Sequence, residues 1–243
     1  MKENKIDYSI CYRKWHDEST EHFESLVPFY RRLILPYVGD NKDINILDVG
    51  CGFGLAIYSL RKLGYKNIKG IDISPQQVKV AQSKGLDVTL VDNTLEYLKD
   101  HTEQFDIVLL LDVLEHTNKE EQIPFLKSIN GSLKAGGKLI LTVPNANSTL
   151  ACRWRYNDWT HYISFTEHSL EFLLLNSGFS KVEIKEMEYL VKPKLPFIPR
   201  KSVCLWFLFK FVRFLRRLEA IAELGYEGKK IPLSLNIIGV AYK

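Results

Sequence analysis

Short apolar segments alternate with longer amphipathic segments from about residue 44 to residue 190. Several of the apolar segments are continuous and rich in β-branched residues, as strands covered on both faces tend to be. These predicted strands are residues 44–49, 68–73, 87–91, 105–111 and 138–143. The amphipathic segments between them predict helices at about 54–63, 75–84, 93–100 and 120–133. Strand–helix alternation of this kind predicts a three-layer α/β domain with a parallel sheet.

Local signals mark where some of these helices begin and end. Ser74 followed by Pro75 is the pattern of an N-cap with proline at the first helical position. Residues 134–137 are expected to close the fourth helix and to turn the chain into the next strand. Thr166 is expected to cap a further helix at about 167–176.

The pattern predicts one domain with an addition at its start and another near its end. A strand at 181–188 and a last strand at 235–242 extend the sheet. The predicted parts are an N-terminal helical cap at 1–40, a core at 44–190, an insert at 191–232 and a last strand at 233–243.

Composition narrows the class of protein. The chain has 243 residues, of which 46% are hydrophobic and 12% aromatic, and this excludes a disordered chain. It contains no uncharged apolar run long enough to span a membrane, and its first residues lack the apolar core of a signal peptide. The four cysteines are too widely spaced to indicate a zinc cage or a disulfide framework, and no metal site is visible. We therefore expect a cytoplasmic protein.

Positive charge is concentrated in one segment. Between residues 189 and 218 there is no acidic residue, but there are Lys or Arg residues at 192, 194, 200, 201, 210, 213, 216 and 217. The net charge of the whole chain is only +4, so the remainder is mildly acidic. This is not the distribution of a nucleic-acid-binding protein, and we expect no nucleic-acid partner.

The most informative stretch is residues 46–54, Ile-Leu-Asp-Val-Gly-Cys-Gly-Phe-Gly, where an apolar strand enters a glycine-rich turn. Glycines permit positive φ and let a ligand approach the backbone closely. Leu55 breaks the G-x-G-x-x-G nicotinamide fingerprint, and no G-K-S/T follows, which excludes a P-loop. A tight turn without a ligand is the alternative interpretation.

Asp72 ends the strand that follows this turn. A carboxylate there can accept two hydrogen bonds from the cis hydroxyls of a ribose. A helix-capping role is the alternative. The glycine turn and Asp72 together are a more specific signal than either feature alone.

At these residues the chain resembles the class I S-adenosylmethionine-dependent methyltransferases. The resemblance continues through Val-Asp-Asn at 91–93 and through residues 105–116 and 133–145, in order and without gaps. Phe165-Thr166 and Gly178-Phe179 resemble a subgroup that includes quinone O-methyltransferases and sugar-modifying enzymes of surface-polysaccharide pathways.

The resemblance implies a Rossmann-like seven-stranded sheet, mostly parallel with an antiparallel last strand. It implies S-adenosylmethionine as cofactor and S-adenosylhomocysteine as product. Asp72 would bind the ribose, Ile73 would pack on the adenine, and Asp92 would accept from the adenine amino group. The full cofactor-binding set that it implies is Asp48, Gly50, Cys51, Gly52, Gly54, Asp72, Ile73, Asp92, Asn93 and Leu111. The long insert at 191–232 is the departure from the family pattern.

Two histidines are candidate catalytic bases. An oxygen acceptor with a high pKa needs a base to take its proton, and histidine suits that role near neutral pH. His116 lies just past the fourth predicted strand, and His161 lies in the loop after the fifth. The alternatives are a backbone-bonded helix-start residue for His116 and a substrate contact for His161. Glu115 could orient His116 or be solvated.

Aromatic and cationic residues indicate where an acceptor could bind. Tyr12 and Trp15 lie in an N-terminal segment that could cover the cofactor as a lid or could simply pack on the domain. Arg153, Arg155 and Trp159 lie in a loop whose composition suits a sugar or an anionic group such as phosphate. An ordinary packed loop is the alternative.

The insert contains a predicted amphipathic helix at 202–218. Apolar residues at 204, 207, 208, 211, 214, 215 and 218 follow helical spacing, and Lys210, Arg213 and Arg217 share the opposite face. This pattern suits a peripheral contact with the inner face of an anionic membrane, and packing on the domain or in a dimer is the alternative. Because the insert leaves the sheet at the cofactor edge, we expect it to cover the acceptor site.

The sequence thus predicts a methyltransferase that acts on a hydroxyl of a glycan or small molecule in surface-polysaccharide biosynthesis. O-methylation of an apolar phenol or quinone is one alternative. A cofactor-binding protein without catalysis is another. The sequence does not determine the methylated atom or the oligomeric state.

Overall fold

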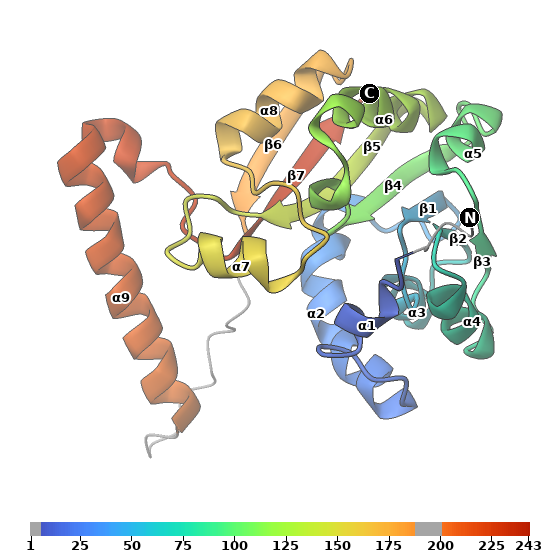
Figure 1. The fold of residues 1–243 in the computed structure, drawn as a ribbon, viewed down its shortest axis with the longest axis horizontal. Helices are drawn as coiled ribbons and strands as arrows, with labels where there is room; N and C mark the ends of the chain where they lie inside the picture. Colours follow the sequence, from blue (N-terminus) through green and yellow to red (C-terminus); the bar gives the residue numbers. More distant parts are fainter. Residues whose placement is uncertain (1–5, 188–200) are drawn as a thin grey trace.

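A seven-stranded sheet organises the fold (Figure 1). The structure is a computed structural model, which describes residues 6–187 and 201–243. The strands are β1 (Asn45–Val49), β2 (Asn67–Asp72), β3 (Val88–Leu90), β4 (Phe105–Leu111), β5 (Leu133–Pro144), β6 (Lys181–Glu186) and β7 (Asn236–Tyr242). Their order across the sheet is β3-β2-β1-β4-β5-β7-β6. The first five strands are parallel and β7 runs antiparallel to both β5 and β6, so the predicted Rossmann-like sheet is confirmed.

Helices connect and cover these strands. They are α1 (Ser9–Tyr12), α2 (Thr20–Val38), α3 (Leu55–Lys62), α4 (Pro75–Ser83), α5 (Thr94–Asp100), α6 (Lys119–Ser132), α7 (Ala151–Asn157), α8 (Glu167–Asn176) and α9 (Lys201–Leu224). Two short 3₁₀ helices, η1 (Leu114–His116) and η2 (Gly225–Lys229), follow β4 and α9.

Two separate hydrophobic cores lie on the two faces of the sheet. Ile46 belongs to one core and its neighbour Leu47 to the other, because successive side chains of a strand point to opposite faces. Helices α2, α3 and α4 contribute to the core of Ile46, and α5, α6 and α8 contribute to the core of Leu47. Burial on both faces explains why the strands are continuously apolar in sequence.

The predicted helix starts have the expected caps. The Ser74 hydroxyl accepts from the Gln77 amide, with Pro75 in the first turn. Thr166 forms a reciprocal capping box with Ser169. These local side-chain bonds satisfy backbone N–H groups that the helix itself leaves unpaired, so the boundaries could be predicted from short-range sequence.

Two local predictions need correction. Residues 134–137 do not form a turn ahead of the strand but lie within β5, and the pairing of β5 with β4 shifts register there. Gly136 adopts a φ of +75° in this irregular stretch, so its glycine serves a bulge in the strand rather than a helix end. The loop after β5 also contains a helix, α7, that sequence analysis did not predict. Residue 188, the last position of the strand expected at 181–188, lies outside the described residues. Residues 189–200, which include the end of the predicted core and the start of the predicted insert, also lie outside them.

Cationic side chains attach the insert helix α9 to the outer part of the sheet. Arg213 and Arg217 both pair with Glu186 at the end of β6, at N–O distances of 3.4 and 3.2 Å. Arg216 Nη2 donates to the carbonyl of Asn147 at 2.9 Å. The helix is therefore attached by the face that carries its arginines. Within residues 6–187 and 201–243, no helix has the length and apolar character needed to cross a membrane.

Candidate active site

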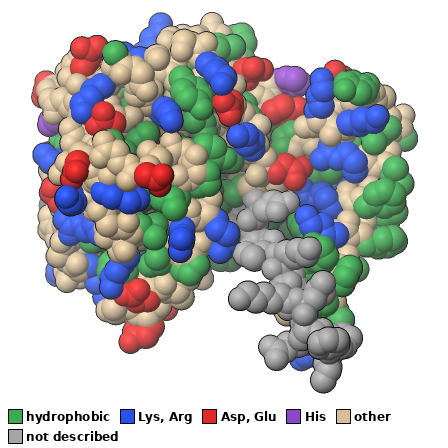
Figure 2. Space-filling view, turned by 180° about the vertical axis from the view of Figure 1, so that it is seen from behind, with side chains coloured by type: hydrophobic (Ala, Val, Ile, Leu, Met, Phe, Trp, Pro, Cys, Tyr) green, Lys and Arg blue, Asp and Glu red, His purple; other side chains and the backbone are tan. Residues whose placement is uncertain are grey.

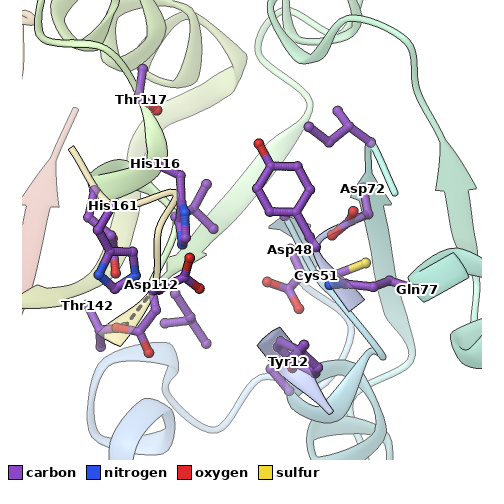
Figure 3. A pocket seen from close by; sticks show the side chains of 18 of the residues that line it. Tyr12, Asp48, Cys51, Asp72, Gln77, Asp112, His116, Thr117, Thr142 and His161 are labelled. Atoms are coloured by element: carbon purple, nitrogen blue, oxygen red, sulfur yellow. Dashed lines mark hydrogen bonds between the residues drawn. The ribbon is translucent and has the colours of Figure 1, made fainter. Parts of the chain in front are cut away.

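A cavity of about 720 Å³ lies at the carboxyl ends of the central strands (Figure 3). Asp48 near the end of β1, Asp72 at the end of β2 and Leu111 at the end of β4 all line it. Tyr12 and Trp15, in and just after α1, line it from the N-terminal side. This is the edge where open parallel sheets bind ligands, and the volume is in the range of cofactor sites.

Most of the predicted site residues meet in this cavity. The lining residues that sequence analysis named are Tyr12, Trp15, Asp48, Gly50, Cys51, Asp72, Ile73, Asp92, Asn93, Leu111, His116 and His161. Gly52 and Gly54 shape the same turn without lining the cavity. The segments that carry these residues are brought together because parallel strands end at one edge of the sheet.

The glycine turn after β1 has the backbone that its sequence predicts. Gly50, Gly52 and Gly54 have φ angles of +70°, +58° and +79°. A Cβ at Gly50 would lie 2.6 Å from Val113 Cγ2, and one at Gly52 would lie 3.0 Å from the Tyr12 ring. Both the backbone conformation and the close approach of neighbours therefore require glycine here.

The contacts of Asp72 support the helix-start alternative and leave the predicted ribose role open to it. Its Oδ2 accepts from the Gly52 amide at 2.8 Å, and its Oδ1 accepts from the Ser74 amide at 2.8 Å. The carboxylate therefore holds the glycine turn against the start of α4. A carboxylate offers about four acceptor positions, so it can still accept from a ribose.

The cavity has an excess of negative charge. Its acidic lining residues are Asp48, Asp72, Asp92, Asp112, Glu115, Glu121 and Asp158. Among the residues that the structure describes, no Lys or Arg lines it. Burial raises the pKa of Asp48 to about 7, with a smaller contribution from the charge of Asp72. Burial also raises the pKa of Asp72, against hydrogen bonds from the Ser74 and Gly52 amides.

A buried carboxylate is destabilised in its ionised form by the loss of water, and a positively charged partner offsets this loss. S-adenosylmethionine carries a sulfonium and an ammonium group, so its charge complements the cavity. The open glycine turn and the ribose-competent Asp72 fit the rest of the molecule. The residues present thus fit the cofactor in charge and in hydrogen-bonding groups.

On the other side of the cavity, three polar side chains form a chain of hydrogen bonds. His116 Nδ1 lies 2.7 Å from Thr160 Oγ1, and Thr160 Oγ1 donates to Asp158 Oδ1 at 2.6 Å. Because Thr160 has one hydroxyl proton and gives it to Asp158, His116 Nδ1 must carry the proton that bonds Thr160. The other ring nitrogen, Nε2, therefore holds a free lone pair.

Electrostatics keeps His116 neutral. Burial, together with the nearby His161, lowers the pKa of His116 to about 4. Burial alone would raise the pKa of Asp158, but hydrogen bonds from Thr160 lower it below the usual value. At neutral pH the pair is thus an uncharged imidazole oriented by an ionised carboxylate through one hydroxyl.

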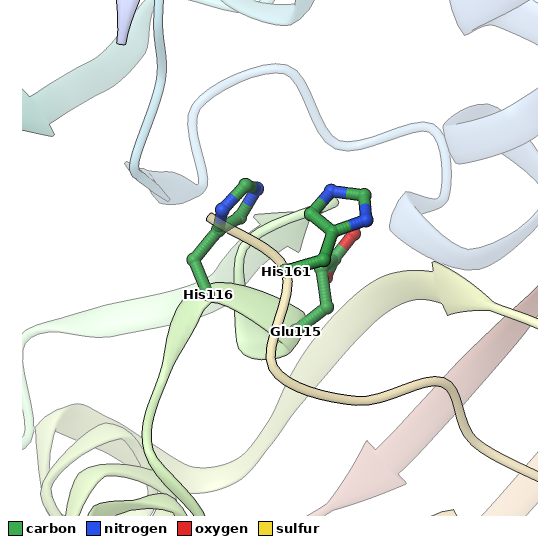
Figure 4. A group of neighbouring side chains, drawn as sticks. All are labelled: Glu115, His116 and His161. Carbon is green, nitrogen blue, oxygen red and sulfur yellow. The ribbon is translucent and has the colours of Figure 1, made fainter. Parts of the chain in front are cut away.

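Glu115, His116 and His161 lie together at the end of this chain of hydrogen bonds (Figure 4). The two imidazole rings are 4.6 Å apart between centroids. One ligand-type atom from each of the three residues lies within 4.8 Å of the others, which is an arrangement that could hold a metal ion. Glu115 Oε2 and His161 Nδ1 are buried without a hydrogen-bond partner. Sequence spacing did not indicate this cluster, because His161 comes from a distant loop.

The site also contains three polar residues that were not predicted as site residues from the sequence: Asp112, Asp158 and Thr160. Asp112 follows β4 directly, has a φ of +55°, and accepts from Thr142 Oγ1 at 3.0 Å and Asn236 Nδ2 at 2.7 Å. An acidic residue at the carboxyl end of a central strand was the available signal for Asp112. For Asp158 and Thr160 the signal was their position just ahead of His161.

Three predicted acceptor residues do not line the cavity. Arg153 and Arg155 lie on α7, where the Arg155 guanidinium lies over the Tyr156 ring at 5.1 Å. Trp159 is 95% exposed. The expectation that the insert covers the site is also wrong for its described part, because no residue of 201–232 lines the cavity. Pairing with Glu186 at the end of β6 holds α9 away from the site.

Residues 21–184 match the family described as "Methyltransferase domain". A ubiquinone biosynthesis O-methyltransferase of Cereibacter sphaeroides is 30% identical over 172 residues, which covers 64% of this chain and 66% of the relative. The same-named protein of Xanthomonas oryzae pv. oryzae is 36% identical over 119 residues, which covers 46% of this chain and 48% of the relative. The matched region thus spans just under two thirds of the first relative and about half of the second.

Solved structures share the fold over nearly the whole chain. An S-adenosylmethionine-dependent methyltransferase of Archaeoglobus fulgidus has a TM-score of 0.68 and 23% identity, and covers 98% of this chain and 100% of its own. Phosphoethanolamine N-methyltransferase 2 of Haemonchus contortus, solved with S-adenosylmethionine, has a TM-score of 0.59 and 18% identity over 89% of this chain and 52% of its own.

Proposed function

Since the chain belongs to the methyltransferase-domain family and takes S-adenosylmethionine as its methyl donor, we propose that it methylates a hydroxyl oxygen of an aromatic small molecule of the phenol or quinone type. The observation that carries this proposal is the position of His116, a neutral imidazole in the cavity whose Nδ1–H bonds Thr160 and whose Nε2 therefore carries no proton. A base of this kind serves a hydroxyl acceptor, which must lose a proton.

Residues of the β1–β2 side would bind the cofactor. Asp72 would accept from the ribose hydroxyls, and Asp48 would face the positive charge. Ile73 is 45% exposed at the cavity, an apolar side chain suited to pack on the adenine. Bound S-adenosylmethionine supplies a methyl group activated on a sulfonium sulfur. The chain's own task is then to orient the acceptor and remove its proton.

His116 Nε2 would take the proton that the acceptor hydroxyl loses when its oxygen gains the methyl group, while the carbon–sulfur bond of the sulfonium would break to leave a neutral thioether. The ring becomes an imidazolium, whose Nδ1–H still donates to Thr160. The Thr160 hydroxyl in turn donates to the ionised Asp158, which stabilises the new positive charge. Asp158 and Thr160 thus act as positioning residues, and His116 is the catalytic base.

The character of the cavity favours an aromatic acceptor over a glycan. The Tyr8 ring lies edge-on to His116 at 6.0 Å, and the Trp15 and Trp154 rings are 5.8 Å apart. Arg153 and Arg155, which were predicted as contacts for a sugar or an anionic group, do not line the cavity. Relatives named as ubiquinone biosynthesis O-methyltransferases support the same preference.

The acceptor class is tested with methyl-labelled cofactor and two panels of acceptors. One panel holds catechols, hydroquinones and simple phenols, and the other holds sugars and sugar nucleotides. We expect label in the aromatic panel alone. Transfer only to sugars, or to neither panel while the cofactor still binds, would contradict the proposal.

The base is tested with His116→Gln, which keeps a polar side chain of similar reach. We expect kcat to fall about 10²–10⁴-fold with cofactor affinity within about twofold of wild type. His101→Gln is the control, because His101 stacks on Tyr97 and does not line the cavity. Wild type and His101→Gln are also assayed after treatment with a chelator. Activity that is lost on chelation and restored by Zn²⁺ would assign proton removal to a cation held by Glu115, His116 and His161 instead.

A further inference from the structure

Helix α9 is oriented with its apolar face outward. The side chains on its inward face are at least partly buried and include Trp206, Arg213, Arg216 and Arg217. Arg217 Nη1 donates to the carbonyls of Gly228 and Ile231 at 2.8 and 2.6 Å, in addition to its pairing with Glu186. This reverses the usual arrangement, in which a surface helix packs its apolar stripe on the core.

The outward face carries large apolar side chains along most of the helix. Each of them is between 46% and 58% exposed: Leu205, Phe207, Leu208, Phe211, Val212, Phe214, Leu215 and Leu218. Figure 2 shows hydrophobic side chains along the outer edge of the molecule at α9, with Lys and Arg side chains between that edge and the body. We call these eight residues the apolar face of α9. A contiguous exposed apolar surface of this kind marks an interaction site.

We infer that the apolar face of α9 docks on the surface of an anionic lipid bilayer. Lys201 and Lys210 are exposed on the same helix, and no acidic residue occurs between 189 and 218. Cations beside an outward apolar face suit a helix that lies in the interface, with its aromatic side chains among the acyl chains and its lysines near the headgroups. The helix lies on the bilayer rather than crossing it, since no described helix can span a membrane.

The place of α9 in the fold makes this surface useful to the enzyme. Arg216 ties the helix to the carbonyl of Asn147, in the loop that leads from β5 into α7. Trp154 of α7 and His161, a few residues further on, line the cavity. A bilayer bound at α9 would therefore lie beside the segment that borders the acceptor side. The inference itself rests on α9 and does not depend on the proposed acceptor.

Vesicle sedimentation with the full-length chain tests the inference. We expect wild-type protein to bind vesicles of phosphatidylcholine with phosphatidylglycerol, and to bind pure phosphatidylcholine vesicles about tenfold more weakly. High salt should weaken the binding to the anionic vesicles. Phe211→Ser should weaken it about tenfold, and the double variant Phe207→Ser/Phe211→Ser should weaken it further, because each phenyl ring that no longer enters the lipid loses its apolar burial.

Phe172→Ser is the matched control. Phe172 is 63% exposed on α8, comparable with the 58% of Phe211, but it lies on another helix. The control should bind vesicles like wild type, and all variants should melt within a few degrees of it because the replaced rings are exposed. Failure of wild type to bind anionic vesicles would overturn the inference, as would undiminished binding by the double variant. A wild-type dimer in sedimentation equilibrium that Phe211→Ser converts to monomer would overturn it in favour of an interface between copies.

Discussion

The cavity has two sides that are built from different kinds of groups (Figure 3). On the side of β1 and β2, which we call the cofactor half, the key features are the backbone of residues 50–54 and the carboxylate of Asp72 that holds it. On the side of β4 and β5, the acceptor half, they are the side chains of His116, Thr160 and Asp158. His116 and Thr160 are 44 positions apart in the chain.

Because the two halves are built differently, they should tolerate different kinds of substitution. The cofactor half depends on positive φ angles and on space beside the backbone, so even a methyl group disrupts it. The acceptor half depends on the direction of a few hydrogen bonds. A substitution that removes one hydroxyl and keeps the side-chain volume is therefore the clearest test of it. A chain can therefore change its acceptor by altering loops while the cofactor half stays the same.

The largest effect is expected from Gly50→Ala in the cofactor half. The new Cβ would lie 2.6 Å from Val113 Cγ2 at a φ of +70°, so the turn or the branched Val113 side chain must shift, and both border the cavity. We expect cofactor affinity to fall about 100-fold or more, which corresponds to about 3 kcal/mol. Calorimetric titration with S-adenosylhomocysteine measures this loss.

Gly85→Ala is the control for that change, because Gly85 has a φ of +69° and nothing within 4 Å of its Cβ position. It should lose about 1 kcal/mol of stability from backbone strain and keep its cofactor affinity. Equal loss of affinity in the two variants would show that strain, rather than the clash with Val113, controls binding.

The next effect is expected from Thr160→Val in the acceptor half. The valine keeps the volume but removes the hydroxyl between His116 and Asp158. We expect kcat to fall about 30-fold with cofactor affinity unchanged, because the base loses its fixed tautomer and its partner charge. Thr117→Val is the control, since Thr117 also lines the cavity but the hydroxyl that bonds His116 Nδ1 is that of Thr160. A normal kcat for Thr160→Val would remove Thr160 from the mechanism.

A smaller effect is expected from Asp72→Asn in the cofactor half. The amide oxygen can still accept from one backbone N–H, but the side chain loses its charge and one acceptor for the ribose. We expect cofactor affinity to fall about tenfold with kcat at saturation within about twofold. Asp87→Asn, at an exposed position before β3, should leave both unchanged. Unchanged affinity for Asp72→Asn would limit Asp72 to holding the glycine turn.

The smallest effect is expected at His16, which lines the cavity from the N-terminal segment. Burial, together with His22 3.0 Å away, lowers the pKa of His16 to about 4. The unfolded chain takes up a proton near pH 6.5 and the folded protein does not, so stability is lost as pH falls from 6.5 towards 4. His16→Gln should reduce this acid loss by about 1 kcal/mol at pH 5, with little change at pH 7.5.

Urea unfolding at both pH values measures the effect of His16→Gln. A variant as sensitive to acid as wild type would assign the loss of stability to other groups, of which His116 is the first to test, because its pKa is also about 4.

The sequence was enough to predict most of the fold and the backbone of the glycine turn in the cofactor half. The apolar strands, the caps at Ser74 and Thr166, and the glycine turn all depend on residues close together in the chain, and Asp72 could be predicted because it ends the next strand. The bulge at 134–137 and helix α7 were missed, because pairing with β4 and packing beside β5 override the local pattern there.

The sequence by itself determined the parallel strands, the glycine turn, the ribose-competent acid and the amphipathic character of α9. These follow from periodicity, from the special backbone of glycine and from side chains a few positions apart. Only the tertiary structure decided that Asp158 and Thr160 orient His116, that Arg153 and Arg155 lie outside the cavity, and which face of α9 points outward. The physical reason is that these outcomes depend on contacts between distant segments, such as that of α9 with Glu186, and an amphipathic pattern does not specify which of its faces finds a partner.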